Sequence, residues 1–242
     1  MNRKSILALI SMFALVGPLP AALVLLTDNF DTGSYGASTF NDYLAADQGG
    51  TLAAITFTMS APGGDWSTQH SNGGGMLIAN AAGNNWVSLN HNFATDANSY
   101  STPLEIQFDA RVTDGAAWSW LGFGIGSAQG TDFYSQPFGV NFTQSAGAHT
   151  YKFEFSDLAG TGSAFNGVSN GAKVDSYIDS VFQGSAYRTL SAADGYLTFK
   201  QDQWDGWSIG HVDNLSITLI PEPHSALLGG LGLLALLRRR RG

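Results

Sequence analysis

The chain has 242 residues, contains no cysteine and carries a formal net charge of −8 at pH 7. The absence of cysteine excludes disulfide bonds, thiolate zinc sites and cysteine nucleophiles. Residues 27–220 hold five basic residues against eighteen acidic ones, a net of −13. Such a region repels nucleic acid and anionic lipid, which argues against both as partners, and it favours divalent cations.

The N-terminus has the order of parts of a secretory signal peptide. Asn2-Arg3-Lys4 is basic, Ile6–Val16 is apolar, and prolines break the helix ahead of Ala22. This order predicts a signal peptide over residues 1–22, with cleavage after Ala22 and export of the remainder through the inner membrane. Pro20 stands where a small residue is preferred, so an uncleaved anchor running on to Leu26 is the alternative.

Residues 27–220 show short alternating runs separated by Gly, Asn and Asp turns, and no sustained helical period. In Leu104–Val112, for example, apolar and polar residues alternate as in a strand with one wet face. The expected strands are Leu52–Met59, Met76–Asn80, Trp86–Asn90, Leu104–Val112, Ser119–Ile125, Phe138–Phe142, His149–Phe155, Lys173–Val181, Tyr196–Gln201 and Trp207–Leu219. No linker or repeat divides them. We therefore expect one all-β domain over residues 23–220, a two-sheet antiparallel jelly-roll sandwich.

Four segments of this region resemble the concanavalin-A-like jelly rolls of the laminin-G and glucanase type. They are Leu26–Asp31, Thr150–Phe155, Val174–Asp179 and Val212–Ile217. The resemblance implies that the first and last strands lie side by side, and that the middle two segments pair in the back sheet. It also implies a structural Ca²⁺ bound by Asp28, Asp31 and Asp213. The alternative is that Asp213 and Asn214 only close a turn by hydrogen bonding to the backbone.

The carboxylates lack the Glu-x-Asp-x-x-Glu strand that the glucanases of this fold use for catalysis. Glu105 and Asp109 are four residues apart with no second glutamate, and Glu154 and Asp157 belong to opposite faces of a strand. We therefore expect no catalytic residues and no enzyme, with Glu105 and Asp109 on a solvent face. A retaining carboxylate pair would have to come from aspartates or from distant strands. No two histidines have metal-ligand spacing.

Tryptophans give the candidate sugar-binding residues. Trp204 and Trp207 flank Asp205-Gly206 in an expected loop, and Trp118 and Trp120 share one face of an expected strand. Exposed indole rings beside Asn and Asp side chains stack on the apolar faces of sugars while the polar groups bind hydroxyls. These four residues are the predicted polysaccharide-binding set. Packing in the core is the alternative for each of them.

The last 22 residues fall into three parts. Pro221-Glu222-Pro223 cannot join a helix because its prolines lack donors and fix φ. Ser225–Leu237 is uncharged, and four arginines, Arg238, Arg239, Arg240 and Arg241, follow it and are retained on the cytoplasmic side of a membrane. The 13-residue run spans about 20 Å as a helix, short of the ~30 Å hydrocarbon core, which favours a temporary anchor. A frayed amphipathic tail is the alternative, but the run has no polar face.

This arrangement resembles the PEP-CTERM sorting signal of bacterial surface proteins. The resemblance implies that an exosortase-type enzyme recognises Pro221-Glu222-Pro223 and removes residues 221–242 after export by the secretion machinery. It also implies an association with extracellular polysaccharide. The predicted function is thus an exported cell-envelope or matrix protein whose lectin-like sandwich is structural or binds polysaccharide. A glycoside hydrolase or lyase with an unrecognised carboxylate site is the alternative.

Overall fold

The computed structural model describes residues 21–30, 48–52, 54–59, 76–80, 83–101, 103–113, 120–127, 148–203 and 208–220. Leu23–Leu219 forms one compact unit. Its elements are β1 (Leu23–Asp28), β2 (Gln48–Gly49), β3 (Phe57–Met59), β4 (Met76–Asn80), β5 (Gly83–Asn92), α2 (Phe93–Tyr100), β6 (Leu104–Thr113), β7 (Trp120–Gly126), β8 (His149–Asp157), β9 (Ala172–Ile178), β10 (Val181–Arg188), β11 (Tyr196–Gln203) and β12 (Ser208–Leu219). Within the described residues, no helix is long and apolar enough to cross a membrane.

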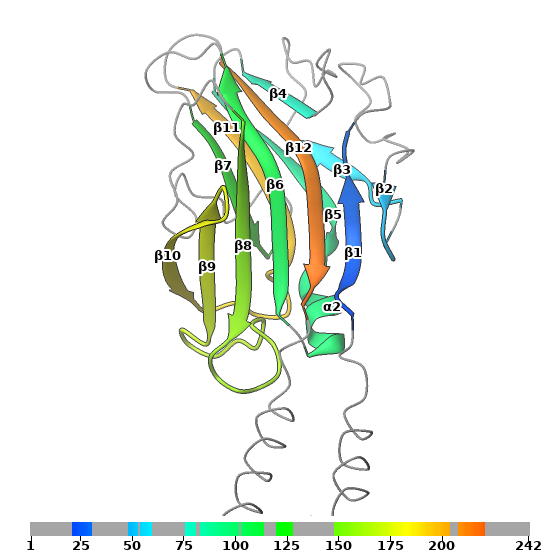
Figure 1. Cartoon of the computed structure of the whole chain (residues 1–242), viewed down its shortest axis with the longest axis vertical. Helices are drawn as coiled ribbons and strands as arrows, with labels where there is room; N and C mark the ends of the chain where they lie inside the picture. Colours follow the sequence, from blue (N-terminus) through cyan, green and yellow to red (C-terminus); the bar gives the residue numbers. More distant parts are fainter. Residues whose placement is uncertain are drawn as a thin grey trace, which may run out of the picture. The chain divides into compact units, whose positions relative to one another are not determined.

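The strands form two antiparallel sheets that lie one behind the other (Figure 1). Sheet A has eight strands in the order β10-β9-β8-β6-β12-β1-β2, and β4 also pairs with β12. Sheet B has four strands in the order β3-β5-β11-β7. The expected all-β, two-sheet antiparallel sandwich is therefore confirmed.

The two strand pairings implied by the jelly-roll resemblance are both present in sheet A. The first strand β1 pairs with the last strand β12, with Leu23 opposite Leu219. In the same sheet β8 pairs with β9, with Phe155 opposite Val174. The chain therefore enters and leaves the sandwich at the same end of the β1–β12 ladder.

Aromatic rings from both sheets fill the space between them. Phe108 and Phe153 of sheet A are buried, as are Phe123 and Phe199 of sheet B. The Phe123 and Phe153 rings stack with centroids 4.6 Å apart, and Phe108 meets Phe199 edge-on at 4.9 Å. Burying large rings in this way supplies most of the favourable free energy that a cysteine-free domain needs.

Several elements differ from the sequence-based expectation. The helix α2 was not predicted; Asn92 caps it by accepting a hydrogen bond from the Ala94 amide at 3.2 Å. Strand β10 was not predicted either, and the turn before it places Asp179 and Ser180 at φ of 49° and 68°. Of the expected strand Leu52–Met59, Phe57–Met59 forms strand β3. The expected strand Phe138–Phe142 lies outside the described residues.

Candidate functional site

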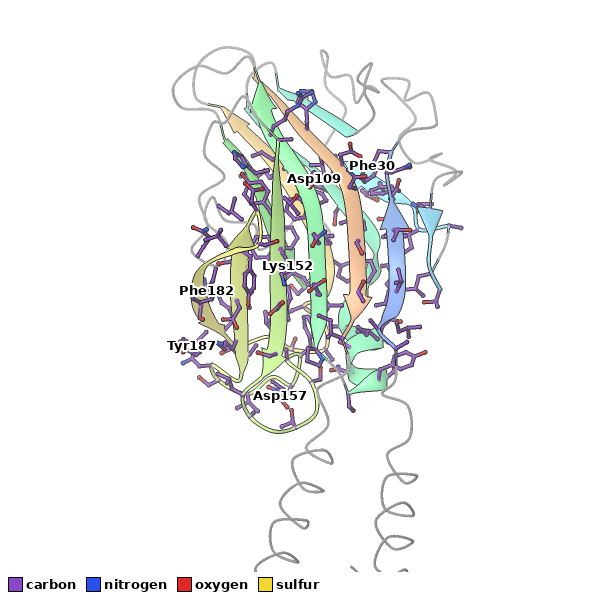
Figure 2. All side chains as sticks on the ribbon, in the orientation of Figure 1. Phe30, Asp109, Lys152, Asp157, Phe182 and Tyr187 are labelled. Carbon is purple, nitrogen blue, oxygen red and sulfur yellow. The ribbon has the colours of Figure 1, made fainter. Side chains whose placement is uncertain are left out.

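The candidate site is the face of sheet A that points away from sheet B, called here the outer face. Residues of β6, β8 and β9 alternate strictly between the two faces, because successive side chains of a strand point to opposite sides. The inward set includes Phe108, Phe153 and Val174, all buried. The outward set is polar and half-buried, and Glu105, Lys152 and Asp175 belong to it. Figure 2 shows Lys152 near the middle of the sheet.

Strand register gathers three carboxylates into one line across the outer face. Glu105 of β6 lies opposite Glu154 of β8, and Glu154 lies opposite Asp175 of β9. On β10, Ser185 lies opposite Asp175 and donates a hydrogen bond to its carboxylate. We call Glu105, Glu154 and Asp175 the acidic row. Directly opposed side chains in a sheet have Cβ atoms ~5 Å apart, so these carboxylates are near neighbours.

Lys152 forms ion pairs with two members of the acidic row. Its Nζ atom lies 2.5 Å from Glu154 Oε1 and 3.5 Å from Glu105 Oε2, and 4.3 Å from the centroid of the Tyr177 ring. Partial burial lowers the pKa of Lys152, but the hydrogen bond to Glu154 and the charges of Glu154 and Glu105 outweigh it, so the pKa is raised. Lys152 is therefore a cation at neutral pH, held between two anions and an aromatic face.

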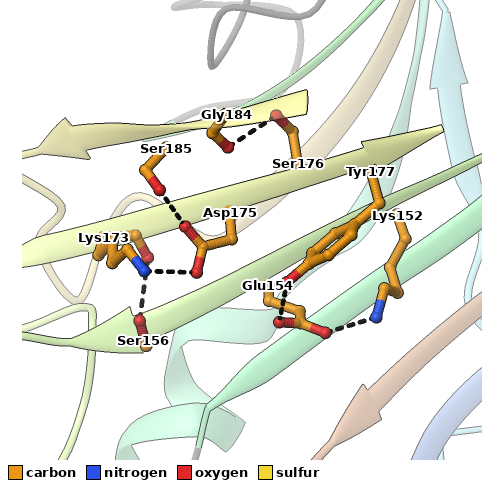
Figure 3. A network of polar contacts seen from close by, with 9 residues as sticks. All are labelled: Lys152, Glu154, Ser156, Lys173, Asp175, Ser176, Tyr177, Gly184 and Ser185. Carbon is orange, nitrogen blue, oxygen red and sulfur yellow. Dashed lines mark hydrogen bonds and ion pairs between the residues drawn. The ribbon is translucent and has the colours of Figure 1, made fainter. Parts of the chain in front are cut away.

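Tyr177 and Lys173 complete the polar network drawn in Figure 3. The Tyr177 hydroxyl donates to Glu154 Oε2 at 3.1 Å. Burial raises the pKa of Tyr177, and the bond to Glu154 raises it further, so the hydroxyl stays protonated at neutral pH. Lys173 Nζ lies 2.6 Å from Asp175 Oδ2, and that hydrogen bond raises the pKa of Lys173. Both lysines of this face are thus paired with carboxylates.

Aromatic side chains border the acidic row along β10, the last strand of sheet A. Phe182 lies opposite Tyr177, and their rings meet edge-on with centroids 5.6 Å apart. Tyr187 lies opposite Lys173. Phe182 is 55% exposed and Tyr187 is 54% exposed, and Ser185 lies between them on the same face. We call Tyr177, Phe182 and Tyr187 the aromatic edge; Figure 2 shows Phe182 and Tyr187 on the flank of the sheet.

Sequence reasoning did not find this face. It placed Glu105 on a solvent face correctly, but it did not bring Glu154, Asp175 or the β10 aromatics to the same place. One signal was available: Lys152 and Glu154, and likewise Lys173 and Asp175, are two residues apart on strands that the resemblance already paired. Such spacing puts a cation and a carboxylate on one face of each strand.

The predicted tryptophan set is largely beyond what the structure describes. Trp118, Trp204 and Trp207 lie outside the described residues, as do Pro221, Glu222, Pro223 and Arg238–Arg241 of the tail. The Trp120 backbone lies in β7 opposite Asp202 of β11. Their predicted roles therefore stay predictions.

Two of the three aspartates of the predicted calcium site, Asp28 and Asp213, are among the described residues. Asp28 faces the core, is 1% exposed, and accepts hydrogen bonds from the Phe30 amide at 2.9 Å and the Gln48 side chain at 3.1 Å. Asp213 lies opposite Asp109 on the outer face and accepts from the Asn214 amide at 2.7 Å. Asp28 and Asp213 thus lie on opposite faces of sheet A, and their role as calcium ligands stays a prediction. Asp31 lies outside the described residues, and among those described no group of three or more metal-binding side chains is found.

No family model matches the chain, and no curated protein matches it. Solved structures do. A binding domain of botulinum neurotoxin DC, solved with rat synaptotagmin II, is 10% identical with a TM-score of 0.44 over 80% of this chain and 47% of that one. An endo-β-1,4-glucuronan lyase of the fungus Trichoderma reesei is 9% identical with a TM-score of 0.42, over 80% and 94%. The carbohydrate recognition domain of Emp46p, in its metal-free form, is 8% identical with a TM-score of 0.44, over 78% and 99%.

The chain spans about half the length of the neurotoxin domain and nearly the whole of the other two chains.

Proposed function

We propose that this chain is an exported cell-envelope protein whose outer face binds an uncharged polysaccharide. The observation that carries the binding proposal is the aromatic edge beside the acidic row. Phe182 and Tyr187 carry half-exposed rings on the same strand. They flank Ser185, which lies opposite Asp175 on the neighbouring strand. Rings supply flat apolar surfaces for the C–H faces of sugars, and the groups between them hydrogen-bond hydroxyls.

The charge of the face selects the class of polysaccharide. The acidic row presents three carboxylates, and the lysines beside it are already paired with them. Residues 27–220 carry a net charge of −13. A uronate-rich chain would bring its own carboxylates against this field, at a cost that grows as the site is desolvated. A neutral glycan avoids that repulsion and uses the carboxylates as hydrogen-bond acceptors.

A binding experiment with a matched control tests the proposal. Phe182→Ala/Tyr187→Ala removes both rings, and Val181→Ala removes an exposed apolar side chain from the same strand. Losing about 1 kcal/mol of stacking per ring corresponds to a roughly 30-fold weaker Kd for the double variant. We expect Val181→Ala to bind as the wild type does. The wild type and both variants should have the same thermal unfolding temperature, which would exclude misfolding.

Affinity electrophoresis against neutral glucans, mannans and xylans, with polyuronates in parallel lanes, gives the readout. Wild-type retention by a neutral polysaccharide, lost in the double variant, is the expected result. Absence of retention by every polysaccharide, or equal retention of wild type and double variant, would overturn the binding proposal.

Export and sorting form the second part of the proposal, and their support is the sequence of the two ends. The signal-peptide pattern over residues 1–22 and the tail over residues 221–242 both favour export, a transient membrane anchor, and release to the cell envelope by an exosortase-type enzyme. Glu222→Ala, or deletion of Arg238–Arg241, should leave full-length precursor in the membrane fraction. Processing that continues unchanged in both variants would show the sorting proposal to be wrong.

One observation keeps a second candidate function open. Glu105 and Glu154 come from strands distant in sequence and lie directly opposite each other, and a retaining glycosidase uses two neighbouring carboxyl groups. Lys152 and Tyr177 already bind this pair, which favours a structural role. Release of reducing ends from a bound neutral polysaccharide, abolished by Glu154→Gln and retained in Asp213→Asn, would establish a hydrolase instead.

A further inference from the structure

A second surface of the sandwich is exposed and apolar but lacks charge. Within the described residues, seven large hydrophobic side chains are exposed, and three of them, Val181, Phe182 and Tyr187, belong to β10. The other four are Val24, Tyr100, Leu158 and Val168. Leu158 and Val168 belong to residues 158–171, the end loop, which contains no charged residue although the domain is strongly acidic.

The end loop is held in a defined shape by a single carboxylate at its base. Asp157 accepts hydrogen bonds from the amides of Ala159, Gly160 and Gly162 at 2.8, 3.1 and 2.6 Å. It also accepts from the side chains of Thr161 and Asn166. The Asp157 charge is thus directed at donors of the loop itself, as Figure 2 places it inside the loop after β8.

The end loop has a buried part and exposed apolar side chains. Phe165 is buried and stacks on Phe155 with centroids 5.9 Å apart. The loop is closed at its base by the Leu158 amide, which donates to the Gly171 carbonyl at 2.9 Å. Leu158 and Val168 remain 53% and 43% exposed, and Tyr100, at the end of α2, is 58% exposed. These side chains are displayed on an ordered surface rather than folded into the core.

Register shows that the end loop lies where the chain enters and leaves the sandwich. Leu219 lies opposite both Leu23 of β1 and Leu104 of β6, and Leu104 lies opposite Phe155 of β8. These residues form one line across sheet A. Tyr100 precedes Leu104, and Leu158 follows Phe155, so both lie beyond that line on the side where Ala22 and Ile220 continue the chain. We call this side the entry end.

The sequence continues past the entry end into an apolar run. Ser225, the first residue of the apolar tail run, follows Leu219 by six residues, which span at most ~20 Å. Leu158 extends beyond the Phe155 line by three residues, or about 10 Å at strand spacing. A bilayer that holds the tail run is therefore within reach of the end loop.

We propose that the entry end contacts the lipid bilayer while the chain is anchored, with Leu158, Val168 and Tyr100 in the headgroup region. The inference rests on the proposed membrane anchor and adds a surface to it. Its partner is a lipid interface because the surface combines apolar and aromatic tips with an absence of charge, which is what the headgroup boundary accepts. The rest of the acidic domain is repelled from anionic headgroups, so the uncharged end loop is the part that can approach them.

The remaining charges near the end loop fit this orientation. The Asp194 carboxylate accepts hydrogen bonds from the amide and hydroxyl of Ser191 at 2.6 and 2.7 Å, so it is directed into its own turn, as Asp157 is. Arg188 lies opposite Ala172, which directly follows the end loop, and it is exposed. A cation beside the end loop would interact favourably with lipid phosphates.

The absence of cysteine allows a direct test on the full chain. Single variants Leu158→Cys, Val168→Cys and Tyr100→Cys, and Val181→Cys on β10 as the matched control, are spin-labelled and reconstituted. The vesicles contain phosphatidylethanolamine with a minor share of phosphatidylglycerol. Power saturation compares collisions with oxygen, which concentrates in the bilayer, and with a water-soluble nickel chelate.

We expect the labels at 158, 168 and 100 to collide more with oxygen and the label at 181 to collide more with nickel, in chains that float with the vesicles. Chains that float with all four labels equally open to nickel would overturn the contact while leaving the anchor intact. Chains that do not float would overturn the anchor and, with it, the contact.

Discussion

The aromatic edge and the end loop both expose apolar side chains, but their surroundings are opposite. Phe182 and Tyr187 lie on a strand beside carboxylates and paired lysines. Leu158 and Val168 lie in an irregular loop without a charged residue, whose neighbouring Asp157 is turned toward amides. Exposure alone therefore does not identify the partner of a surface. The polar groups beside the apolar ones do, and they point to a hydroxylated chain in one case and to lipid in the other.

The two surfaces also differ in what stabilises them. The aromatic edge is part of sheet A, and the inward side chains of β8 and β9 pack that sheet against the core. The end loop depends on a network of local hydrogen bonds around Asp157. Substitutions in the core should therefore disturb both surfaces, and substitutions at one surface should disturb that surface alone.

Loss of the shared core should disturb both surfaces at once. Phe153 is fully buried and packs on Phe108 and Phe123, so Phe153→Ala should lower the free energy of unfolding by about 3–5 kcal/mol. Urea unfolding followed by tryptophan fluorescence measures the loss. Gln107→Ala, outward on the neighbouring strand, is the control and should change stability by less than about 0.5 kcal/mol. Equal effects of the two variants would contradict the assigned core.

Loss of the Asp157 carboxylate should disturb the end loop alone. Asp157→Ala leaves the amides of Ala159, Gly160 and Gly162 without their acceptor, and we expect a loss of about 2 kcal/mol. Hydrogen exchange should become faster in residues 159–168 and stay unchanged in β9 and β10. Faster exchange along β10 as well would show that the two surfaces are not independent.

The same carboxylate gives the end loop a pH dependence. Partial burial raises the pKa of Asp157, but the bonds from Gly162, Ala159 and Thr161 outweigh it, so the pKa is lowered. A lowered folded-state pKa stabilises the fold fully above the ordinary value of about 3.9 and ceases to do so as pH falls through the lowered value. The protection of the end-loop amides, measured relative to their intrinsic exchange rate at each pH, should therefore fall only below pH ~4. Asp157→Asn should remove this acid dependence.

More of the fold than of the candidate site could be predicted from the sequence. The alternation of apolar and polar residues in Leu104–Val112 predicts β6 and its two faces, because a strand with one buried side has apolar residues at every second position. Strand β10 could not be found in this way, since as the last strand of sheet A it turns only Gly184 and Ala186 toward the core and exposes most of its apolar residues. Helix α2 has eight residues, of which three are buried, too few for a visible helical period.

The acidic row could not be predicted, because it depends on register between distant strands. Glu105 and Glu154 are 49 residues apart in the chain, and one residue of slippage between β6 and β8 would place them on opposite faces. Local sequence could pair each lysine only with the carboxylate two residues away. Which carboxylate lies across the sheet is set by the packing of both strands on the core.

The smallest predicted effect on stability comes from a substitution on the outer face, outside the core. Lys152→Met removes the cation between Glu105 and Glu154 and should cost about 1 kcal/mol at pH 7, since half-exposed ion pairs contribute little to stability. The pKa of Lys152 is raised, so the contribution is complete below its ordinary value of about 10.4 and is lost as pH rises through the raised value. Lys173→Met, which removes the cation beside a single aspartate, is the matched control and should have a smaller effect on the free energy of unfolding measured in urea. A Lys152→Met cost that stays unchanged in about 1 M NaCl, where ion pairs are screened, would mean that the methylene stem of Lys152, rather than its charge, stabilises the outer face.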